Sequence, residues 1–291
     1  MIVMRMMGGL GNQLFQYALG RFLAEKNQTF LYIDLSYYRT NSKHPFLLDK
    51  FYCSYQEIKR DQLVFLPENE RWYKMVKWAQ KIIPVRHRNI ISDFSAKYRP
   101  AIKTASPPVY LEGYWQSPKY FEKIKTLVRE ECRVKDPPQG ENADLLARIR
   151  ENHNPVCLHV RRGDFVNDEE IHEKHGICSM DYYQRAIEII RREVEEPTFF
   201  VFSDDKQFVQ DQFGNDEHFV IVKGNKVDEA HEDLRLMYHC NHFIIANSTF
   251  SWWGAWLSPN DNKTVIAPED WFKNKRKFTI SDLIPDSWKL I

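Results

Sequence analysis

The chain has 291 residues, of which 43% are hydrophobic and 28% are charged. These proportions are close to the average for globular proteins and exclude a disordered, collagen-like or coiled-coil chain. The net charge of +1 gives no general nucleic-acid signature, and no apolar stretch approaches the roughly 18–20 uncharged residues that cross a bilayer.

The chain opens with the pattern of an α/β domain. Residues 2–6 form a short apolar run that stops at the glycine turn 8–12. Apolar residues at helical spacing then predict a helix over 13–26, and 29–35 is typical of a second strand. A strand, turn, helix and strand in this order indicate a parallel sheet.

The middle of the chain, from about 40 to 135, is less regular, and the pair Pro137-Pro138 marks the best domain boundary. Beyond it the α/β alternation resumes. Strands are predicted at 155–160, 198–202, 219–222, 242–246 and 264–267, and helices at 181–195, 228–240 and 250–257, with Asp181 as the N-cap of the first of these helices.

Polar side chains directly follow three of these predicted strands. The clusters are His159 with Arg161, Arg162 and Asp164; Ser203 with Asp204 and Asp205; and Asn247 with Ser248, Thr249 and Ser251. Ligands of open α/β sheets bind beyond the carboxyl ends of the strands. The three clusters therefore indicate one binding site.

The first two clusters suit a nucleotide. Arg161 and Arg162 are bidentate donors for phosphate oxygens, although a salt bridge with Asp164 is an alternative role for the pair. Asp204 or Asp205 can accept hydrogen bonds from a guanine, or else cap the helix that follows.

The third cluster and the glycine turn add backbone donors. Hydroxyls and free N–H groups at the start of the 250–257 helix form an anion site, although Ser248 or Thr249 can also serve as a simple cap. Leu14 stands where a dinucleotide fingerprint requires glycine, and no P-loop motif occurs, so these two classes are excluded. What remains at 8–12 is a turn that lets backbone approach a ligand closely.

Metal-binding and disulfide patterns are weak. There is no Asp-x-Asp triplet, and the histidines lack a matching set of carboxylates or thiols. The five cysteines are odd in number and widely spaced, so reduced thiols fit better than disulfides or structural zinc. A pyrophosphate bound here would need Arg161 and the helix start to balance its charge, and we expect no metal cofactor.

Four segments together resemble the bacterial α-1,2-fucosyltransferases. They are GGLGNQLFQYALG at 8–20, HVRRGDFV at 159–166, FSDD at 202–205 and NSTFSWWGAWL at 247–257, and they cover nearly the whole chain. The His-x-Arg-Arg-x-Asp element is shared with α-1,6- and protein O-fucosyltransferases. The run Asn-Ser-Thr-Phe-Ser-Trp-Trp, which starts at residue 247, and the glycine-rich opening at 8–20 are more specific to the α-1,2 group.

The resemblance implies a GT-B-like α/β fold, with two Rossmann-like domains and the active site in the cleft between them. Residues 1–138 would form the acceptor-side domain and residues 139–291 the GDP-fucose-binding domain. The implied enzyme is a galactoside 2-α-L-fucosyltransferase, which moves L-fucose from GDP-fucose to the 2-hydroxyl of a terminal galactose with inversion and without a metal. Its acceptor would be a glycan of the bacterial surface that could be lipid-linked, and nucleic acid is not an expected partner.

The resemblance also implies roles for individual residues. Arg161 would contact the pyrophosphate and stabilise its charge as it leaves, while Asp164, held ionised by two arginines, would orient rather than accept a proton. A carboxylate such as Asp34 or Glu112 is a candidate base. The predicted donor-site residues are Gly11, Asn12, Gln13, His159, Arg161, Arg162, Ser203, Asp204, Asn247, Ser248, Thr249 and Ser251.

Two alternatives for the activity stay open at this point. One is a fucosyltransferase of α-1,6 or protein O-linked type, and the other is a non-catalytic protein that binds GDP or a glycan. For the acceptor, Trp115 and Trp252 are candidates to stack on a sugar ring, although burial in a helix is the alternative for Trp252.

The location of the protein depends on two further features. The amino terminus is too short and too rich in glycine for a signal peptide, so we expect a cytoplasmic protein. Residues 1–150 contain 25 Lys and Arg against 15 Asp and Glu, whereas residues 151–291 contain 16 against 25. The basic half could face an anionic membrane, and scattered surface charge explains the numbers equally well.

Within the basic half, residues 71–88 combine aromatic and basic side chains. Lys74, Lys77 and Lys81 lie off an apolar stripe at helical spacing, which consists of Trp72, Met75, Ala79 and Ile82. Such a segment can bind the inner face of an anionic membrane. The alternative is a surface helix that packs this stripe on its own domain.

Overall fold

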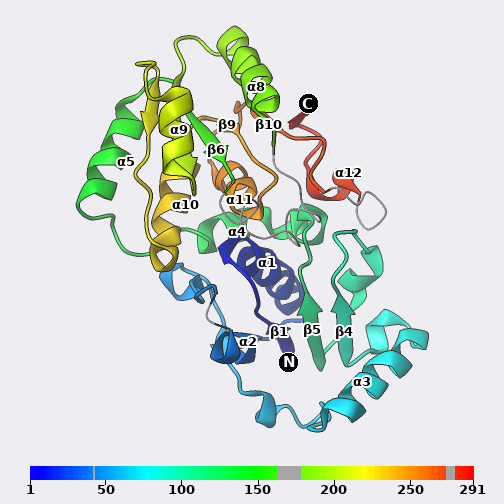
Figure 1. The fold of residues 1–291 in the computed structure, drawn as a ribbon. Helices are drawn as coiled ribbons and strands as arrows, with labels where there is room; N and C mark the ends of the chain where they lie inside the picture. The colour runs from blue at the N-terminus through cyan, green and yellow to red at the C-terminus, as the bar shows by residue number, and fades with distance from the viewer. Residues whose placement is uncertain (42, 163–177, 273–278) are drawn as a thin grey trace. The chain divides into compact units, whose positions relative to one another are not determined.

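The computed structural model describes residues 1–41, 43–162, 178–272 and 279–291. They divide into two compact units, Met1–Arg133 and Val134–Ile291 (Figure 1). This division lies a few residues before the Pro137-Pro138 pair at which the sequence predicts a boundary. Among the described residues, no helix is both long and apolar enough to cross a membrane.

The N-terminal unit is built on a parallel sheet of five strands in the order β3-β2-β1-β5-β4. The strands are β1 (Ile2–Arg5), β2 (Leu31–Asp34), β3 (Gln56–Glu57), β4 (Ile90–Asp93) and β5 (Val109–Gly113). The central strands β1 and β5 are buried along almost their whole length, as a near-continuous apolar run predicts for a parallel sheet.

Helix α1 (Leu10–Lys26) connects β1 to β2 and is buried over most of its surface. It begins three residues earlier than its apolar spacing predicts, because the backbone N–H groups of Asn12 and Gln13 both donate to the carbonyl of Gly9. Residues 10–12 of the glycine turn thus belong to the first turn of the helix, and Gly9 is its N-cap. The other α-helices of this unit are α2 (Ser36–Thr40), α3 (Glu70–Ala79) and α4 (Lys125–Glu131).

The C-terminal unit contains a parallel sheet of six strands in the order β11-β10-β9-β6-β7-β8. The strands are β6 (Pro155–Val160), β7 (Thr198–Ser203), β8 (Phe219–Ile221), β9 (His242–Ile244), β10 (Val265–Ala267) and β11 (Lys289–Leu290). Strands added after β6 first extend to one side and then, from β9, to the other. This is the doubly wound order, and its switch point lies between β6 and β9.

Helices cover this sheet. They are α5 (Glu141–Glu151), α8 (Met180–Glu193), α9 (Lys206–Phe213), α10 (Ala230–Tyr238), α11 (Thr249–Leu257) and α12 (Ile280–Leu283) (Figure 1). Helices α8 and α9 share one core with alternate residues of β6, among them Val156, Leu158 and Val160. His159 lies between these residues and therefore points to the opposite face of the sheet.

One predicted helix start is wrong. The N-cap of α8 is Ser179, whose hydroxyl accepts from the backbone N–H of Tyr182, and not Asp181. Asp181 lies in the first turn, where its negative charge interacts favourably with the positive end of the helix dipole. Its carboxylate also pairs with Arg185 at 2.9 Å. Both residues suit a helix N-terminus, and the backbone geometry selects the serine.

We expect Gly113→Ala to destabilise the N-terminal unit by about 1–3 kcal/mol, the usual cost of overpacking. A Cβ at Gly113 would lie 1.9 Å from the carbonyl oxygen of Asp93, its partner on the adjacent strand β4, and backbone in a sheet cannot move aside. Calorimetric unfolding of the full chain measures the loss. In Gly9→Ala, the added carbon meets only His44, at an ordinary 3.7 Å, so this variant should lose less; an equal loss in both variants would contradict the clash.

Candidate functional site

The three polar clusters start at the same edge of the C-terminal sheet. Strand β6 pairs with both β7 and β9, with Val160 opposite Ser203 and Leu158 opposite Ile244. Because all three strands are parallel, their carboxyl ends meet at one edge, next to the switch point. Neighbouring clusters are about 40 residues apart in the sequence, roughly the length of one βαβ unit, and the tertiary structure brings them together.

Arg161 and Asp204 form an ion pair at this edge. The Nε of Arg161 lies 3.0 Å from Oδ2 of Asp204, and both side chains are 28% exposed. The other oxygen of Asp204 accepts from the backbone N–H of Arg162 at 2.8 Å. Asp204 thus ties the end of β7 to the residues after β6. Asp164, the partner that the sequence suggested for these arginines, lies outside the described residues.

Arg162 is held in a different way. Its Nε is 3.4 Å from Oδ2 of Asp205, and its guanidinium carbon lies 3.7 Å from the centre of the Phe208 ring. Asp205 caps α9 by accepting from the backbone N–H of Phe208, and its own N–H donates to the hydroxyl of Ser203. Ser203 and Asp205 therefore shape the loop, and Phe208, which the sequence analysis did not single out, supports Arg162.

His159 is buried, with 4% of its surface exposed, and its ring lies 6.2 Å from that of Phe250 on α11. Burial, reinforced by the positive charge of Arg161, lowers the pKa of His159 to about 3. The imidazole is therefore neutral at physiological pH. Its Nδ1 is buried and has no hydrogen-bond partner among the described residues, which leaves a polar atom available to a ligand.

The start of α11 presents two partly exposed hydroxyl residues. Ser248 is the N-cap, and its hydroxyl accepts from the backbone N–H of Phe250 at 3.3 Å. Thr249 is the first residue of the helix and is also partly exposed. N–H groups and hydroxyls at a helix N-terminus favour an anion, and capping does not remove this property.

Asn247 and Ser251 are buried beside these hydroxyls. The amide of Asn247 donates to the carbonyl of Trp271 at 3.4 Å, and the Ser251 hydroxyl donates to the carbonyl of Ser248 at 3.3 Å. Both residues hold the turn before α11. In this structure they support the helix start from within, whereas Ser248 and Thr249 are open to solvent.

The glycine turn of the N-terminal unit is more closed than the sequence suggests. Gly11 is buried within α1, and Asn12 is partly exposed with its side-chain oxygen accepting from Gln116 at 2.8 Å. Asn12 therefore connects the turn after β1 to the segment after β5. It stays a predicted donor contact.

Gln13 has a role in the scaffold that the sequence analysis did not foresee. Its side chain is fully buried, with the amide nitrogen donating to the carbonyls of Gly8 and Pro45 and the amide oxygen accepting from the N–H of Leu47. These bonds use both amide hydrogens. The geometry thus does not support the prediction that Gln13 contacts the donor.

The structure also argues against both predicted acceptor residues. Trp115 is 2% exposed and packs edge-on against Tyr120, and Trp252 is fully buried with its indole N–H donating to the carbonyl of Leu283 at 3.0 Å. A ring must offer an open face to stack on a sugar. For Trp252 the alternative of burial in the helix is the observed one.

The two candidate bases of the N-terminal unit are also engaged. Glu112 is bonded to Arg5 and Lys77, and although burial alone raises the pKa of Glu112, the bond and charge of Lys77 bring it below its usual value. Asp34 is buried and accepts from the Tyr110 hydroxyl and the Ser36 N–H. Neither carboxylate is placed to accept a proton from a substrate.

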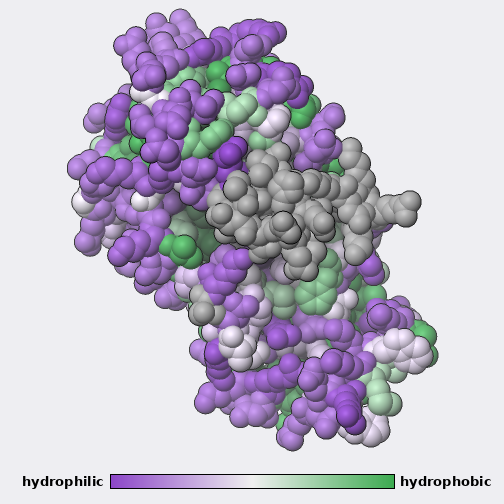
Figure 2. Space-filling model, viewed as in Figure 1, coloured by the Kyte–Doolittle hydropathy of each residue, from purple (hydrophilic) through white to green (hydrophobic). Residues whose placement is uncertain are grey.

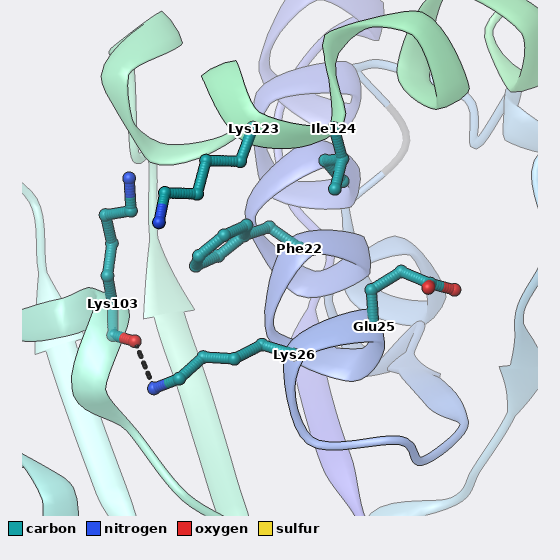
Figure 3. A pocket seen from close by; sticks show the side chains of 6 residues that line it. All are labelled: Phe22, Glu25, Lys26, Lys103, Lys123 and Ile124. Atoms are coloured by element: carbon teal, nitrogen blue, oxygen red, sulfur yellow. Dashed lines mark hydrogen bonds between the residues drawn. The ribbon is translucent and has the colours of Figure 1, made fainter.

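A cavity of about 440 Å³ lies elsewhere in the N-terminal unit (Figure 3). It is lined by Phe22, Glu25, Lys26, Lys103, Lys123 and Ile124, and the ammonium of Lys26 closes one side by donating to the carbonyl of Lys103. None of the predicted site residues lines it. Within the described ranges, no three His, Cys, Asp or Glu side chains are placed to bind a metal ion.

Comparison with known proteins bears on the chemistry of this site. The family model of glycosyl transferase family 11 matches residues 1–289. The Escherichia coli O-antigen biosynthesis glycosyltransferase WbnK is 30% identical over 97% of this chain and 97% of its own length. An Escherichia coli α-1,2-colitosyltransferase is 31% identical over 99% and 97%, and a rat galactoside α-(1,2)-fucosyltransferase 2 is 25% identical over 90% and 68%.

Solved structures confirm the fold. The α-1,6-fucosyltransferase NodZ, from a crystal soaked with GDP-fucose, aligns with a TM-score of 0.51 at 14% identity over 88% of this chain and 92% of its own. A variant of Arabidopsis thaliana FUT1 in complex with GDP aligns with a TM-score of 0.52 at 13% identity over 92% and 70%. The expectation of a GT-B-like fold with two Rossmann-like units is therefore correct.

We expect the low pKa of His159 to make folding weaken as the pH falls. Between about pH 6.5 and 3 the unfolded chain binds a proton at this position that the folded chain does not. The contribution to stability is therefore complete above that window and is lost progressively within it as the pH falls, by up to about 1.4 kcal/mol per pH unit. Unfolding temperatures of His159→Gln across this range should show a shallower slope than the wild type. His218→Gln, at an exposed position, is the control, and an unchanged slope in His159→Gln would contradict a neutral His159.

Proposed function

The chain belongs to glycosyl transferase family 11 and is a glycosyltransferase, and from this premise we propose that it is a galactoside α-1,2-fucosyltransferase that uses GDP-fucose. The likeness to galactoside α-(1,2)-fucosyltransferases supports both the linkage and the acceptor. The likeness to an O-antigen glycosyltransferase supports a glycan of the bacterial surface as the substrate.

One observation carries the assignment of the donor site, namely that the Arg161–Asp204 pair lies at the same sheet edge as the start of α11. A guanidinium has five N–H donors in a rigid fork, so one edge can bind a carboxylate while another binds phosphate. After the neighbouring strand β9, Ser248 and Thr249 begin a helix whose dipole favours negative charge. We assign the diphosphate of the donor to these groups.

The same groups would assist the chemical step. The bond between the anomeric carbon and the diphosphate oxygen breaks, and GDP leaves with the electron pair. The 2-hydroxyl oxygen of galactose forms the new bond from the opposite side, and its proton is released to solvent. Negative charge grows on the diphosphate as the bond breaks, and donors already fixed in place stabilise it without reorganisation. Asp204 fixes the plane of the Arg161 guanidinium for this purpose.

The geometry supports two further proposals. His159 is neutral, so it can bond to the nucleotide without adding charge, and its unpartnered Nδ1 supports contact with the guanine. The guanidinium and the helix dipole together supply the positive charge that a divalent cation supplies in other sugar-nucleotide enzymes. We therefore propose that transfer does not need a metal.

A second donor is a specific alternative. The α-1,2-colitosyltransferase covers almost the whole chain at 31% identity, a closer match than the rat fucosyltransferase at 25%. Donor choice between fucose and colitose depends on contacts to the sugar ring, and the diphosphate site described above serves both donors equally.

Incubation of the purified protein with GDP-fucose or GDP-colitose and a panel of β-galactosides tests the function. We expect faster turnover with GDP-fucose, a product linked α-1,2, and an unchanged rate when a chelator is added. Preference for GDP-colitose would replace the proposed donor, and an α-1,6 product would replace the linkage. Binding of GDP with no transfer to any acceptor would indicate a non-catalytic protein, and loss of activity with the chelator would contradict metal independence.

We expect Arg161→Ala to lower kcat about 100- to 1,000-fold while the protein stays folded, the usual effect of removing one donor to a developing negative charge. Asp204 is partly exposed, so water can solvate it once its partner is gone. Steady-state release of GDP measures the loss. The control is Arg185→Ala, which removes an exposed arginine paired with Asp181 on α8 of the same unit. Near-normal turnover of Arg161→Ala would overturn the phosphate role.

A further inference from the structure

Helix α3 and the short 3-10 turn Gln80–Ile82 that follows it expose an apolar ridge to solvent. Four side chains form it, and they are Trp72 (60% exposed), Met75 (58%), Trp78 (74%) and Ile82 (90%). The surface view shows pale and green atoms over this segment, at the lower right (Figure 2). The alternative that this stripe packs on its own domain is therefore wrong.

The helix is firmly attached by its opposite side. Tyr73 is buried, with its ring 6.4 Å from that of Tyr110 on β5 and the Arg60 guanidinium 4.5 Å from its centre. The side chain of Gln80 is also buried and accepts from the N–H of Ile90 at the start of β4 at 2.8 Å. The ridge is thus held outward by a packed inner face and does not result from a loose helix.

Positive charge surrounds the ridge. The segment 71–88 contains six Lys and Arg and no Asp or Glu. Lys77 turns inward to Glu112, whereas the exposed basic side chains are Arg71, Lys74, Lys81 and Arg86. Lys74 pairs with Glu70 at the start of the helix, but a fully exposed ion pair contributes little free energy. The pair therefore does little to hold Lys74 away from another anion. The surface formed by the ridge and these four cations is called the α3 face below.

We propose that the α3 face docks on the surface of an anionic lipid bilayer. Tryptophan side chains partition to the interface between headgroups and acyl chains, and lysine and arginine next to them bind anionic headgroups. A second copy of the chain is a poor occupant, because two α3 faces would bring like charges together. This inference goes beyond the transferase proposal and does not depend on it.

Co-sedimentation of the full chain with vesicles tests the proposal. We expect binding to vesicles of phosphatidylglycerol and phosphatidylcholine in equal parts, at least tenfold weaker binding to phosphatidylcholine alone, and weakening by salt. A double variant of the ridge, Trp78→Ser with Ile82→Ser, and a double variant of its rim, Lys74→Glu with Lys81→Glu, should each lower the partition coefficient at least tenfold. All four positions are exposed, so both variants should keep the unfolding temperature of the wild type.

Matched controls change other exposed side chains, away from the α3 face. Phe30→Ser with Val227→Ser removes apolar side chains that are 66% and 62% exposed, and Lys125→Glu with Lys226→Glu reverses the same number of charges. Both controls should bind vesicles like the wild type. Equal binding to both vesicle types, or equal loss in variants and controls, would overturn the proposal. Sedimentation velocity without vesicles gives the oligomeric state. If the wild type associates there and the ridge variant does not, the proposal is also overturned, because the α3 face would then join copies of the chain.

Binding to vesicles needs neither donor nor acceptor, so it separates this proposal from the proposed function. We expect the ridge variant to keep full turnover with a soluble β-galactoside, because no residue of the ridge belongs to the donor site. Loss of vesicle binding with activity intact supports the α3 face. A chain that binds anionic vesicles but transfers no sugar would overturn the proposed function alone.

Discussion

The ion pair between Arg161 and Asp204 is the interaction on which the candidate site depends. It joins the residues that leave β6 to those that leave β7, and the same carboxylate accepts from the backbone of Arg162. An arginine side chain is long and flexible, and a partner that holds its Nε leaves the rest of the fork in a defined plane. Ordering the guanidinium before a ligand arrives lowers the entropy lost on binding.

The two units use their polar residues differently at the strand ends. In the C-terminal unit, Arg161, Ser248 and Thr249 stay partly exposed where the doubly wound sheet has its switch point. In the N-terminal unit, Gln13 and Glu112 are buried and bonded to the protein itself. Buried polar groups need partners, so these side chains serve to hold the turn and the sheet. The groups that we assign to the diphosphate are therefore all in the C-terminal unit.

The tryptophans show how one residue type serves opposite purposes. Trp115 and Trp252 are buried in their units, whereas Trp72 and Trp78 lie on the exposed side of α3. Burial of a tryptophan contributes to the core, and its exposure beside lysines and arginines is unfavourable unless another surface covers it. Trp72 and Trp78 thus differ from the buried tryptophans in their exposure, which the amino-acid composition does not reveal.

The sequence by itself determined the α/β class, the opening strand, helix and strand, most of the elements after residue 155 and the three polar clusters at strand ends, because apolar periodicity and turn residues are local signals. It did not reveal the strands β3, β4 and β5 in the less regular middle of the chain. Only the tertiary structure decided that Asp204 is the partner of Arg161 and that the Gln13 amide is hydrogen-bonded to Pro45 and Leu47. It also decided which tryptophans are buried. Each of these outcomes depends on residues brought together from distant parts of the chain. A local pattern does not encode which of several suitable carboxylates, carbonyls or apolar surfaces will be the neighbour after folding.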